Sequence, residues 1–170
     1  RRVKELEAFF ERQGKRLFVE RIRKGKRIVD DVRPREVLHL GDEVVLSGRY
    51  EYTIGEEKWI GREVDDTALL DFPVMVMKTT VAGHSHKRDI TYGGKKIGEL
   101  RRQPFMHGVV IQKIKRMGVN IPVFADTLLN TGDVIELVGK KIDVTLAAKE
   151  IGYPDPATNE TDIVYLSLGI

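Results

Sequence analysis

The 170-residue sequence contains no cysteine. This absence excludes a disulfide framework, a cysteine-based zinc site and a cysteine nucleophile. The sequence also has no run of the roughly 20 apolar residues that a membrane-spanning helix needs. Aromatic residues make up only 7% of it. With 41% hydrophobic and 32% charged residues, the composition is that of an ordinary globular domain with enough apolar residues for a core.

The chain also has little excess of charge of either sign. Its 29 basic residues are nearly balanced by 26 acidic ones, and the formal net charge is +3. Basic residues are spread along the chain and interleaved with acidic ones, and no basic stripe carries interleaved aromatic residues. A nucleic-acid interface would normally show both features. We therefore expect no nucleic-acid partner, and a basic nucleic-acid-binding domain remains the third alternative for function.

One stretch of the sequence occurs twice. Residues 129–139 read LNTGDVIELVG, and residues 38–48 read LHLGDEVVLSG, 91 positions earlier. Glycine permits a positive φ and aspartate caps a turn with its side chain, so each copy reads as a turn that leads into a half-buried strand. Asp42 and Asp133 are therefore predicted to serve turn structure and not catalysis.

The segments before each copy follow the same order. Apolar residues at helical spacing predict a helix from Val3 that ends near Gly14, and a short helix at 97–101. Strands are predicted at 17–22, 28–29, 109–114 and 121–124. Each unit thus reads helix, strand, strand, strand. Further strands are predicted at 74–77 and 89–92, the latter entering the second unit, and a helix at 141–150.

Two basic pairs end matched strands and are the candidate ligand-binding residues: Arg23 and Lys24 in the first unit, Lys115 and Arg116 in the second. Their repetition suggests a site for an anionic ligand or a carboxylate. The alternative is that they are solvated strand ends.

The other motifs in the sequence give weaker indications of a functional site. His84, His86 and Asp89 have a spacing that a hairpin can use for a metal, but the sequence places no further strong ligand, so no metal site is predicted. The glycine-rich stretch 93–98 lacks the spacing of a nucleotide-binding loop and reads as a turn. No Ser–His–acid set, carboxylate pair or nucleophile elbow is present, so we do not expect an enzyme. No cofactor is identified.

The final residues, 163–170, form an apolar run that has two readings. It is either the start of a hydrophobic segment of a longer protein or a C-terminal strand. The proline-containing stretch 154–159 before it is predicted to be a linker that continues neither helix nor sheet.

These motifs resemble a known family. Residues 113–139 resemble the C-terminal domain of regulators of potassium conductance, the TrkA_C type, and residues 19–48 resemble it more weakly. Two such domains in tandem are similar to the cytoplasmic loop of the aspartate:alanine exchanger family of transporters. Residues 61–66, 152–154 and 161–170 resemble that family's inter-domain segment, domain exit and approach to the next membrane helix.

The resemblance implies an α+β fold of two tandem small two-layer units, each a mixed sheet with one or two helices. It places the first repeat at 1–60, an inter-repeat segment at 61–85, the second repeat at 86–152 and a linker toward an absent membrane helix at 153–170.

The function implied is that of a cytoplasmic regulatory or ligand-sensing module of a bacterial amino-acid exchanger, at the cytoplasmic face of the inner membrane. A gating or assembly domain of a potassium uptake or channel system is the alternative. The expected partners are the membrane-spanning halves of the same protein, a small-molecule or ion ligand, and a second copy in a homodimer.

Overall fold

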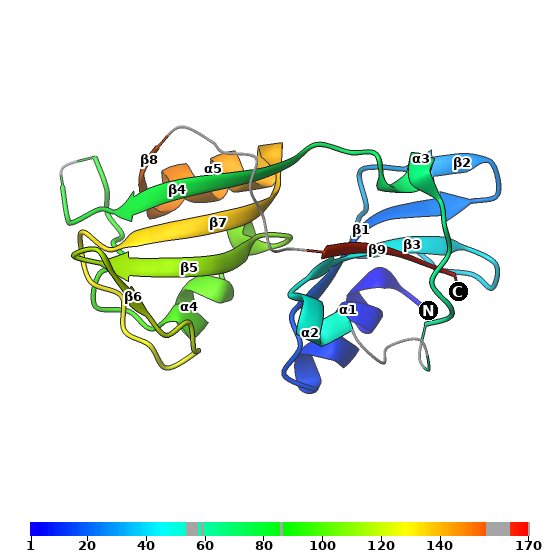
Figure 1. Ribbon diagram of the computed structural model, residues 1–170, viewed down its shortest axis with the longest axis horizontal. Helices are drawn as coiled ribbons and strands as arrows, with labels where there is room; N and C mark the ends of the chain where they lie inside the picture. The colour runs from blue at the N-terminus through cyan, green and yellow to red at the C-terminus, as the bar shows by residue number, and fades with distance from the viewer. Residues whose placement is uncertain (54–57, 59, 86, 156–163, 170) are drawn as a thin grey trace. The chain divides into compact units, whose positions relative to one another are not determined.

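The computed structural model describes residues 1–53, 58, 60–85, 87–155 and 164–169. These residues form an α+β fold with a four-stranded and a five-stranded sheet, so the predicted α+β class is confirmed (Figure 1). The chain divides into two compact units, residues 1–72 with 162–170, and residues 73–161. We call them unit 1 and unit 2. Among the described residues, no helix has the length and apolar character needed to cross a membrane.

Unit 1 has the sheet order β2-β1-β3-β9. Its elements are α1 (Val3–Arg12), β1 (Leu17–Lys24), β2 (Arg27–Val29), β3 (Glu43–Gly48), α2 (Tyr50–Thr53), α3 (Thr67–Leu70) and β9 (Val164–Gly169). The predicted helix that ends near Gly14 is confirmed as α1. Its buried residues Val3, Leu6 and Phe10 share one helix face and pack against the apolar residues of β1 and β3.

Unit 2 has the sheet order β6-β5-β7-β4-β8. Its elements are β4 (Val74–Val81), α4 (Ile97–Arg101), the 3₁₀ helix η2 (Pro104–Met106), β5 (Val110–Arg116), β6 (Val119–Ile121), β7 (Val134–Lys140), α5 (Lys141–Ile151) and β8 (Gly152–Pro154). Residues of α4 and α5 share one core with β5 and β7. The predicted helices at 97–101 and 141–150 are confirmed.

Every strand pair in the two sheets is antiparallel, so the predicted mixed sheets are wrong in this detail. Parallel neighbours require a crossover connection of a dozen or more residues. Here β1–β2 and β5–β6 are tight hairpins, and each following strand returns beside the first strand of its hairpin.

The strand predicted at 89–92 is also wrong, because that segment forms neither strand nor helix. The Thr91 hydroxyl donates a hydrogen bond to the Ala82 carbonyl, so the chain closes a loop there instead of extending. The strand that enters unit 2 is β4, which pairs with β7 from Val74↔Lys140 to Thr80↔Val134.

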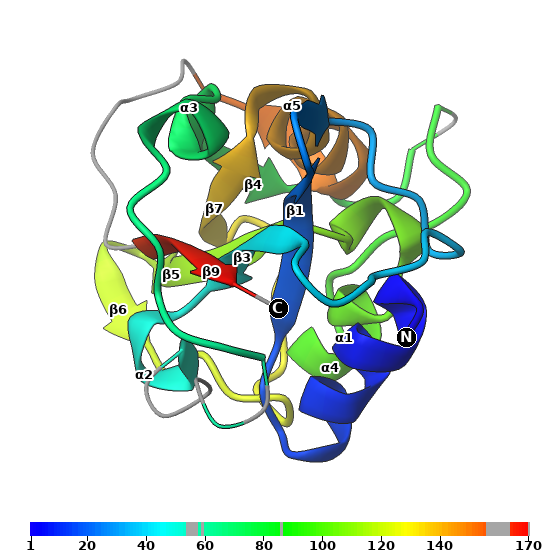
Figure 2. The same cartoon turned by 90° about the vertical axis from the view of Figure 1, so that its right-hand side faces the viewer.

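Strand β9 takes the place beside β3 in unit 1 that β4 takes beside β7 in unit 2 (Figure 2). It is paired with β3 along its length, from Glu43↔Gly169 to Gly48↔Val164. Residues 164–169 of the final apolar run thus form a strand, which is one of its two readings. Pro154, the first residue of the stretch 154–159 predicted to continue neither helix nor sheet, is the last residue of β8, so that prediction is wrong at this position. Residues 156–159 of the stretch lie outside the described residues.

The glycine that ends each copy of the repeated stretch is fixed by close backbone approach. A Cβ on Gly48 would lie 2.7 Å from the Arg16 carbonyl oxygen, and a Cβ on Gly139 would lie 2.6 Å from the Gly108 carbonyl oxygen. Real Cβ atoms essentially never approach other atoms so closely. The second glycine of the motif therefore lets the backbone before β1 or β5 pack onto the strand.

Candidate functional site

The two Gly-Asp turns are held by the same contacts in both units. The Asp42 carboxylate accepts a hydrogen bond from the His39 amide at 2.9 Å, and the Asp133 carboxylate accepts one from the Asn130 amide at 2.8 Å. Gly41 and Gly132 have φ values of 91° and 90°, which favour glycine. The predicted structural role of both aspartates is confirmed.

The second residue of each basic pair joins this turn. Arg116 donates two hydrogen bonds of 2.9 Å to the Asp133 carboxylate, and a third to the Leu128 carbonyl. Lys24 donates to the Val37 carbonyl and lies 3.9 Å from the Asp42 carboxylate. The hydrogen bonds to the Asp133 carboxylate raise the pKa of Arg116 above its usual value. Both cations therefore fasten the end of the first long strand to the turn before β3 or β7.

The first residues of the basic pairs differ in their surroundings. Arg23 makes a two-bond ion pair with Asp66, which also caps α3 by accepting from the Leu69 amide at 3.0 Å. Lys115 is exposed on β5. The structure thus engages Arg23, Lys24 and Arg116 in contacts within their own units, and a ligand at these four residues stays a prediction.

The first strand also carries Arg21, which sequence reasoning did not select. Its guanidinium donates to the carbonyls of Ala68, Leu69 and Asp71 and lies over the Phe72 ring at 5.2 Å from the ring centroid. Arg21 and Arg23 together hold residues 66–72 on β1. We call residues 66–72 the strap of unit 1.

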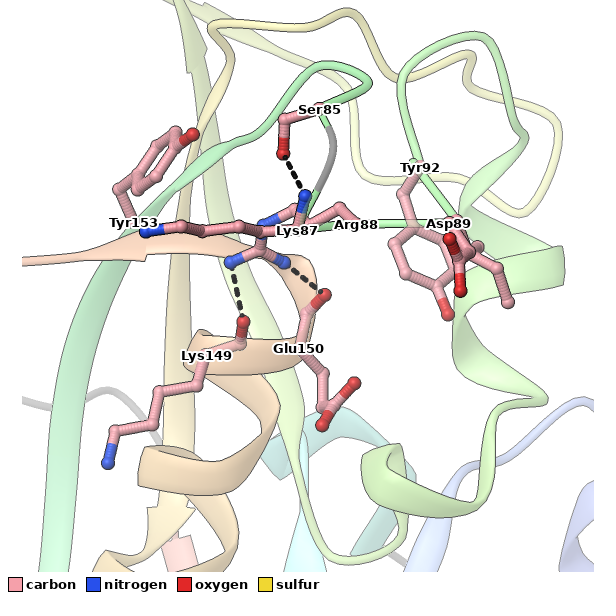
Figure 3. Close-up of a pocket in the computed structure, with 9 residues that line it drawn as sticks. Ser85, Lys87, Arg88, Asp89, Tyr92, Lys149, Glu150 and Tyr153 are labelled. Carbon is pink, nitrogen blue, oxygen red and sulfur yellow. Dashed lines mark hydrogen bonds between the residues drawn. The ribbon is translucent and has the colours of Figure 1, made fainter.

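A pocket of about 480 Å³ lies in unit 2, at the end of β4 (Figure 3). It is formed by the loop that follows β4, the last turn of α5 and β8. The lining residues are Ser85, Lys87, Arg88, Asp89, Ile90, Tyr92, Lys149, Glu150 and Tyr153. Its volume falls within the range of about 300–1,000 Å³ that is typical of small-molecule sites. We call it the Arg88 pocket.

Arg88 fixes the geometry of this pocket. Its guanidinium donates hydrogen bonds to the carbonyls of Lys149, Glu150 and Gly152, at 2.8–3.0 Å. The last carbonyls of a helix have no partner within the helix, so a cation at this end satisfies them and also interacts favourably with the helix dipole. The same guanidinium lies over the Tyr153 ring, 5.6 Å from its centroid. One side chain thus binds the loop to both α5 and β8.

The backbone around Arg88 is equally constrained. The Arg88 amide donates to the Ser85 carbonyl in a tight turn, and the Ala82 amide donates to the Ile151 carbonyl. A Cβ on Gly152 would lie 1.7 Å from the Thr80 carbonyl oxygen, so only glycine allows β8 to pair with β4 at this point. Close packing between the backbones of β4, the loop after it and β8 therefore supports the pocket.

Tyr92 forms the inner wall of the pocket and is only 5% exposed. Its ring packs edge-on against Phe105, with centroids 5.9 Å apart. Burial raises the pKa of the Tyr92 phenol, and the Glu150 carboxylate raises it further. Tyr92 therefore remains a neutral hydrogen-bond donor at physiological pH.

Sequence reasoning did not find this pocket. The stretch 81–88 reads in the sequence as a loop or hairpin tip, and its only chemical signal is the spacing of His84, His86 and Asp89. His84 is exposed, Asp89 lines the pocket, and His86 lies outside the described residues. Among the residues that the structure describes, no group of three or more His, Cys, Asp or Glu side chains is placed to hold a metal ion.

The chain is similar to bacterial proteins named as uncharacterized transporters. It is 35% identical to one from Bradyrhizobium diazoefficiens over 162 residues, which cover 92% of this chain and 27% of the relative. It is 31% identical over 155 residues to one from Bordetella parapertussis, covering 91% of this chain and 26% of the relative. A third, from Shewanella oneidensis, is 28% identical over 172 residues and covers 99% of this chain.

The chain spans about a quarter of the length of the curated relatives that it matches. No protein-family model matches the chain. The TrkA_C resemblance therefore stays an expectation. No solved structure matches the chain either. Over nearly its whole length, the chain is homologous to a segment of bacterial proteins named as transporters.

Proposed function

We propose that this chain is a regulatory, ligand-sensing module of a bacterial secondary transporter of the amino-acid exchanger type, and that it senses its ligand in the Arg88 pocket. The similarity to about a quarter of each transporter-named relative supports an accessory segment. The proposal places the module on the cytoplasmic side of the inner membrane, joined to membrane-spanning parts of the same protein and paired with a second copy. It assigns the chain no enzymatic activity.

The observation that carries the proposal is the position of the Arg88 side chain. This guanidinium is the common partner of the loop that follows β4, the end of α5 and the start of β8. A ligand that contacts the pocket therefore touches three elements that a single residue connects. Ligand binding can act on a protein only through a difference in affinity between two of its states. A pocket at such a junction is suited to provide that difference, because a shift of the loop changes contacts on both α5 and β8.

The proposal is tested by reconstituting the full-length transporter in lipid vesicles and measuring amino-acid exchange while the amino acid on the module side is varied. The test variant is Tyr153→Ala, which removes the aromatic surface under Arg88. Arg12→Ala, at an exposed position on α1, is the matched control. We expect Tyr153→Ala to keep the maximal exchange rate and to lose the concentration dependence of regulation. Regulation that is identical in Tyr153→Ala, Arg12→Ala and the unmodified protein would contradict the proposal.

A further inference from the structure

The Arg88 pocket carries charged side chains of both signs that the fold does not use. Lys87, Lys149, Asp89 and Glu150 are exposed along its lining. Within the part of the chain that the structure describes, the side chains of these four residues make no hydrogen bond or ion pair with one another or with a third group. Arg88 differs from them, because backbone carbonyls occupy its guanidinium. The pocket therefore has two ammonium and two carboxylate groups available for a ligand.

These charges are separated within the pocket. Figure 3 shows Lys149 and Tyr153 on one side of the Arg88 guanidinium and Asp89 and Tyr92 on the other, with Glu150 below it. A purely anionic ligand would meet the carboxylates of Asp89 and Glu150, and a purely cationic ligand would meet the lysines. Like charges brought together disfavour binding, whereas a ligand with one charge of each sign can satisfy both sides.

The uncharged groups of the pocket fit the same ligand. The neutral Tyr92 phenol stands on the acidic side and can donate a hydrogen bond. Ile90 and Tyr153, residues that are 58% and 60% exposed, offer apolar surface for a hydrocarbon side chain. The volume of about 480 Å³ is ample for a molecule of about ten non-hydrogen atoms.

We infer that the Arg88 pocket binds a free α-amino acid as its zwitterion. The ligand carboxylate lies toward Lys149 and Lys87, and the ligand ammonium lies toward Glu150 and Asp89. Only the physiological meaning of this binding, sensing by a transporter, rests on the proposed function. The binding itself is a property of unit 2.

The test is isothermal titration calorimetry of the 170-residue chain with L-alanine, L-aspartate and L-methionine, together with N-acetyl-L-alanine and L-alaninamide. The two derivatives each lack one charge of the zwitterion. We expect saturable binding of at least one free amino acid, and at least tenfold weaker binding of both derivatives than of L-alanine. The inference is overturned if no free amino acid binds, or if either derivative binds as well as L-alanine does.

Charge-neutralising variants then locate the site. Glu150→Gln retains side-chain size, Lys149→Gln keeps a polar uncharged side chain, and both positions are exposed, so the fold is expected to persist. Each variant is expected to raise the Kd at least tenfold, because each removes one charged contact with the ligand. The matched controls Glu11→Gln and Lys26→Gln, at exposed positions in unit 1, are expected to leave the Kd unchanged. Binding that survives both pocket variants would place the amino acid elsewhere and overturn the inference.

Failure of the inference is distinguishable from failure of the proposed function. If a free amino acid binds in the calorimeter but Tyr153→Ala has no effect on exchange, the amino-acid site is supported and the regulatory role is contradicted. Regulated exchange that is lost in Tyr153→Ala, with no free amino acid binding to the chain, would keep the regulatory role and overturn the ligand assignment.

Discussion

Units 1 and 2 share a scaffold but differ at one end. In both, a cation at the end of the first long strand is fastened to a Gly-Asp turn and to a carbonyl five residues before the aspartate. After β3, however, unit 1 has the four-residue α2, whereas after β7 unit 2 has the eleven-residue α5 and then β8. The shared contacts define architecture, and the additional elements of unit 2 form the pocket. Function is therefore best sought where the two units differ.

The largest effect is expected from Gly152→Ala, in a part of unit 2 that has no counterpart among the described residues of unit 1. The added methyl group would lie 1.7 Å from the Thr80 carbonyl oxygen, which forces β8 away from β4. Overpacking of this kind costs about 1–3 kcal/mol, and more where backbone must move, so we expect a loss of about 3 kcal/mol or more in the free energy of unfolding. Urea unfolding, with hydrogen exchange to locate the loss, measures this effect.

Gly83→Ala is the matched control, since it lies in the loop after β4 and its Cβ would come no closer than 3.4 Å to the Thr131 side chain. We expect it to cost less than about 1 kcal/mol. Equal losses for Gly152→Ala and Gly83→Ala would show that β8 is not held by close packing.

The next largest effect compares the two Gly-Asp turns. Asp133 is 1% exposed and is paired with Arg116 through two hydrogen bonds, whereas Asp42 lies 3.9 Å from Lys24. Because charge-assisted hydrogen bonds contribute more than distant pairs, we expect Asp133→Ala to cost about 2–3 kcal/mol and Asp42→Ala about 1 kcal/mol. Hydrogen exchange resolved by unit separates the two effects. A larger loss in unit 1 than in unit 2 would reverse the proposed order.

A pH effect is expected in unit 1. Hydrogen bonds from Arg23 lower the pKa of Asp66, and the bond from the Leu69 amide lowers it further. A lowered pKa contributes stability that is fully present above the unfolded value of about 3.9 and is lost as pH falls through the folded pKa. The strap of unit 1 should therefore loosen only below about pH 4.

The pKa of Glu43, near Asp66, is shifted in the opposite direction. Burial raises its pKa and the neighbouring Asp66 carboxylate raises it further, so protonation of Glu43 favours the folded state as pH falls. NMR titration follows both groups, through the Leu69 amide for Asp66 and the side-chain carboxyl carbon for Glu43. A Leu69 amide that titrates at or above the usual aspartate range would contradict the assignment, and Asp66→Asn should abolish the acid transition of this amide.

The smallest effect is expected at Lys115, the exposed member of its basic pair. Lys115→Ala should change the free energy of unfolding by no more than about 0.5 kcal/mol, as is usual for exposed positions without specific contacts. The same variant tests the predicted ligand role of the basic pairs, which the amino-acid titrations can read directly. Loss of binding in Lys115→Ala, with normal binding in Glu150→Gln, would move the site from the Arg88 pocket to the basic pairs.

Local sequence signals predicted the parts of the fold that depend on local chemistry. The spacing of Val3, Leu6 and Phe10 predicted α1, and the two Gly-Asp dipeptides predicted turns that the structure confirms. These predictions succeeded because helix periodicity and turn geometry are decided by residues close together in the chain.

The features that the sequence did not reveal depend on distant residues. Arg88 donates to the carbonyls of Lys149, Glu150 and Gly152, which lie more than 60 positions away, and no local pattern marks that contact. The irregular pairing at Glu20 in β1, and at Gln112 in β5, likewise depends on the partner strand. The sequence predicts the strand that enters unit 2 at 89–92, but the Thr91 hydroxyl bonds to the distant Ala82 carbonyl and closes a loop there instead.

The most direct test of the central claim is hydrogen exchange of the intact chain with and without saturating L-alanine, L-aspartate or L-methionine. We predict that at least one amino acid slows exchange at residues 82–92 and 149–155 of unit 2 and leaves β1, β2 and β3 of unit 1 unchanged. Slower exchange confined to unit 1, or no change in either unit with any of the three amino acids, would contradict this claim.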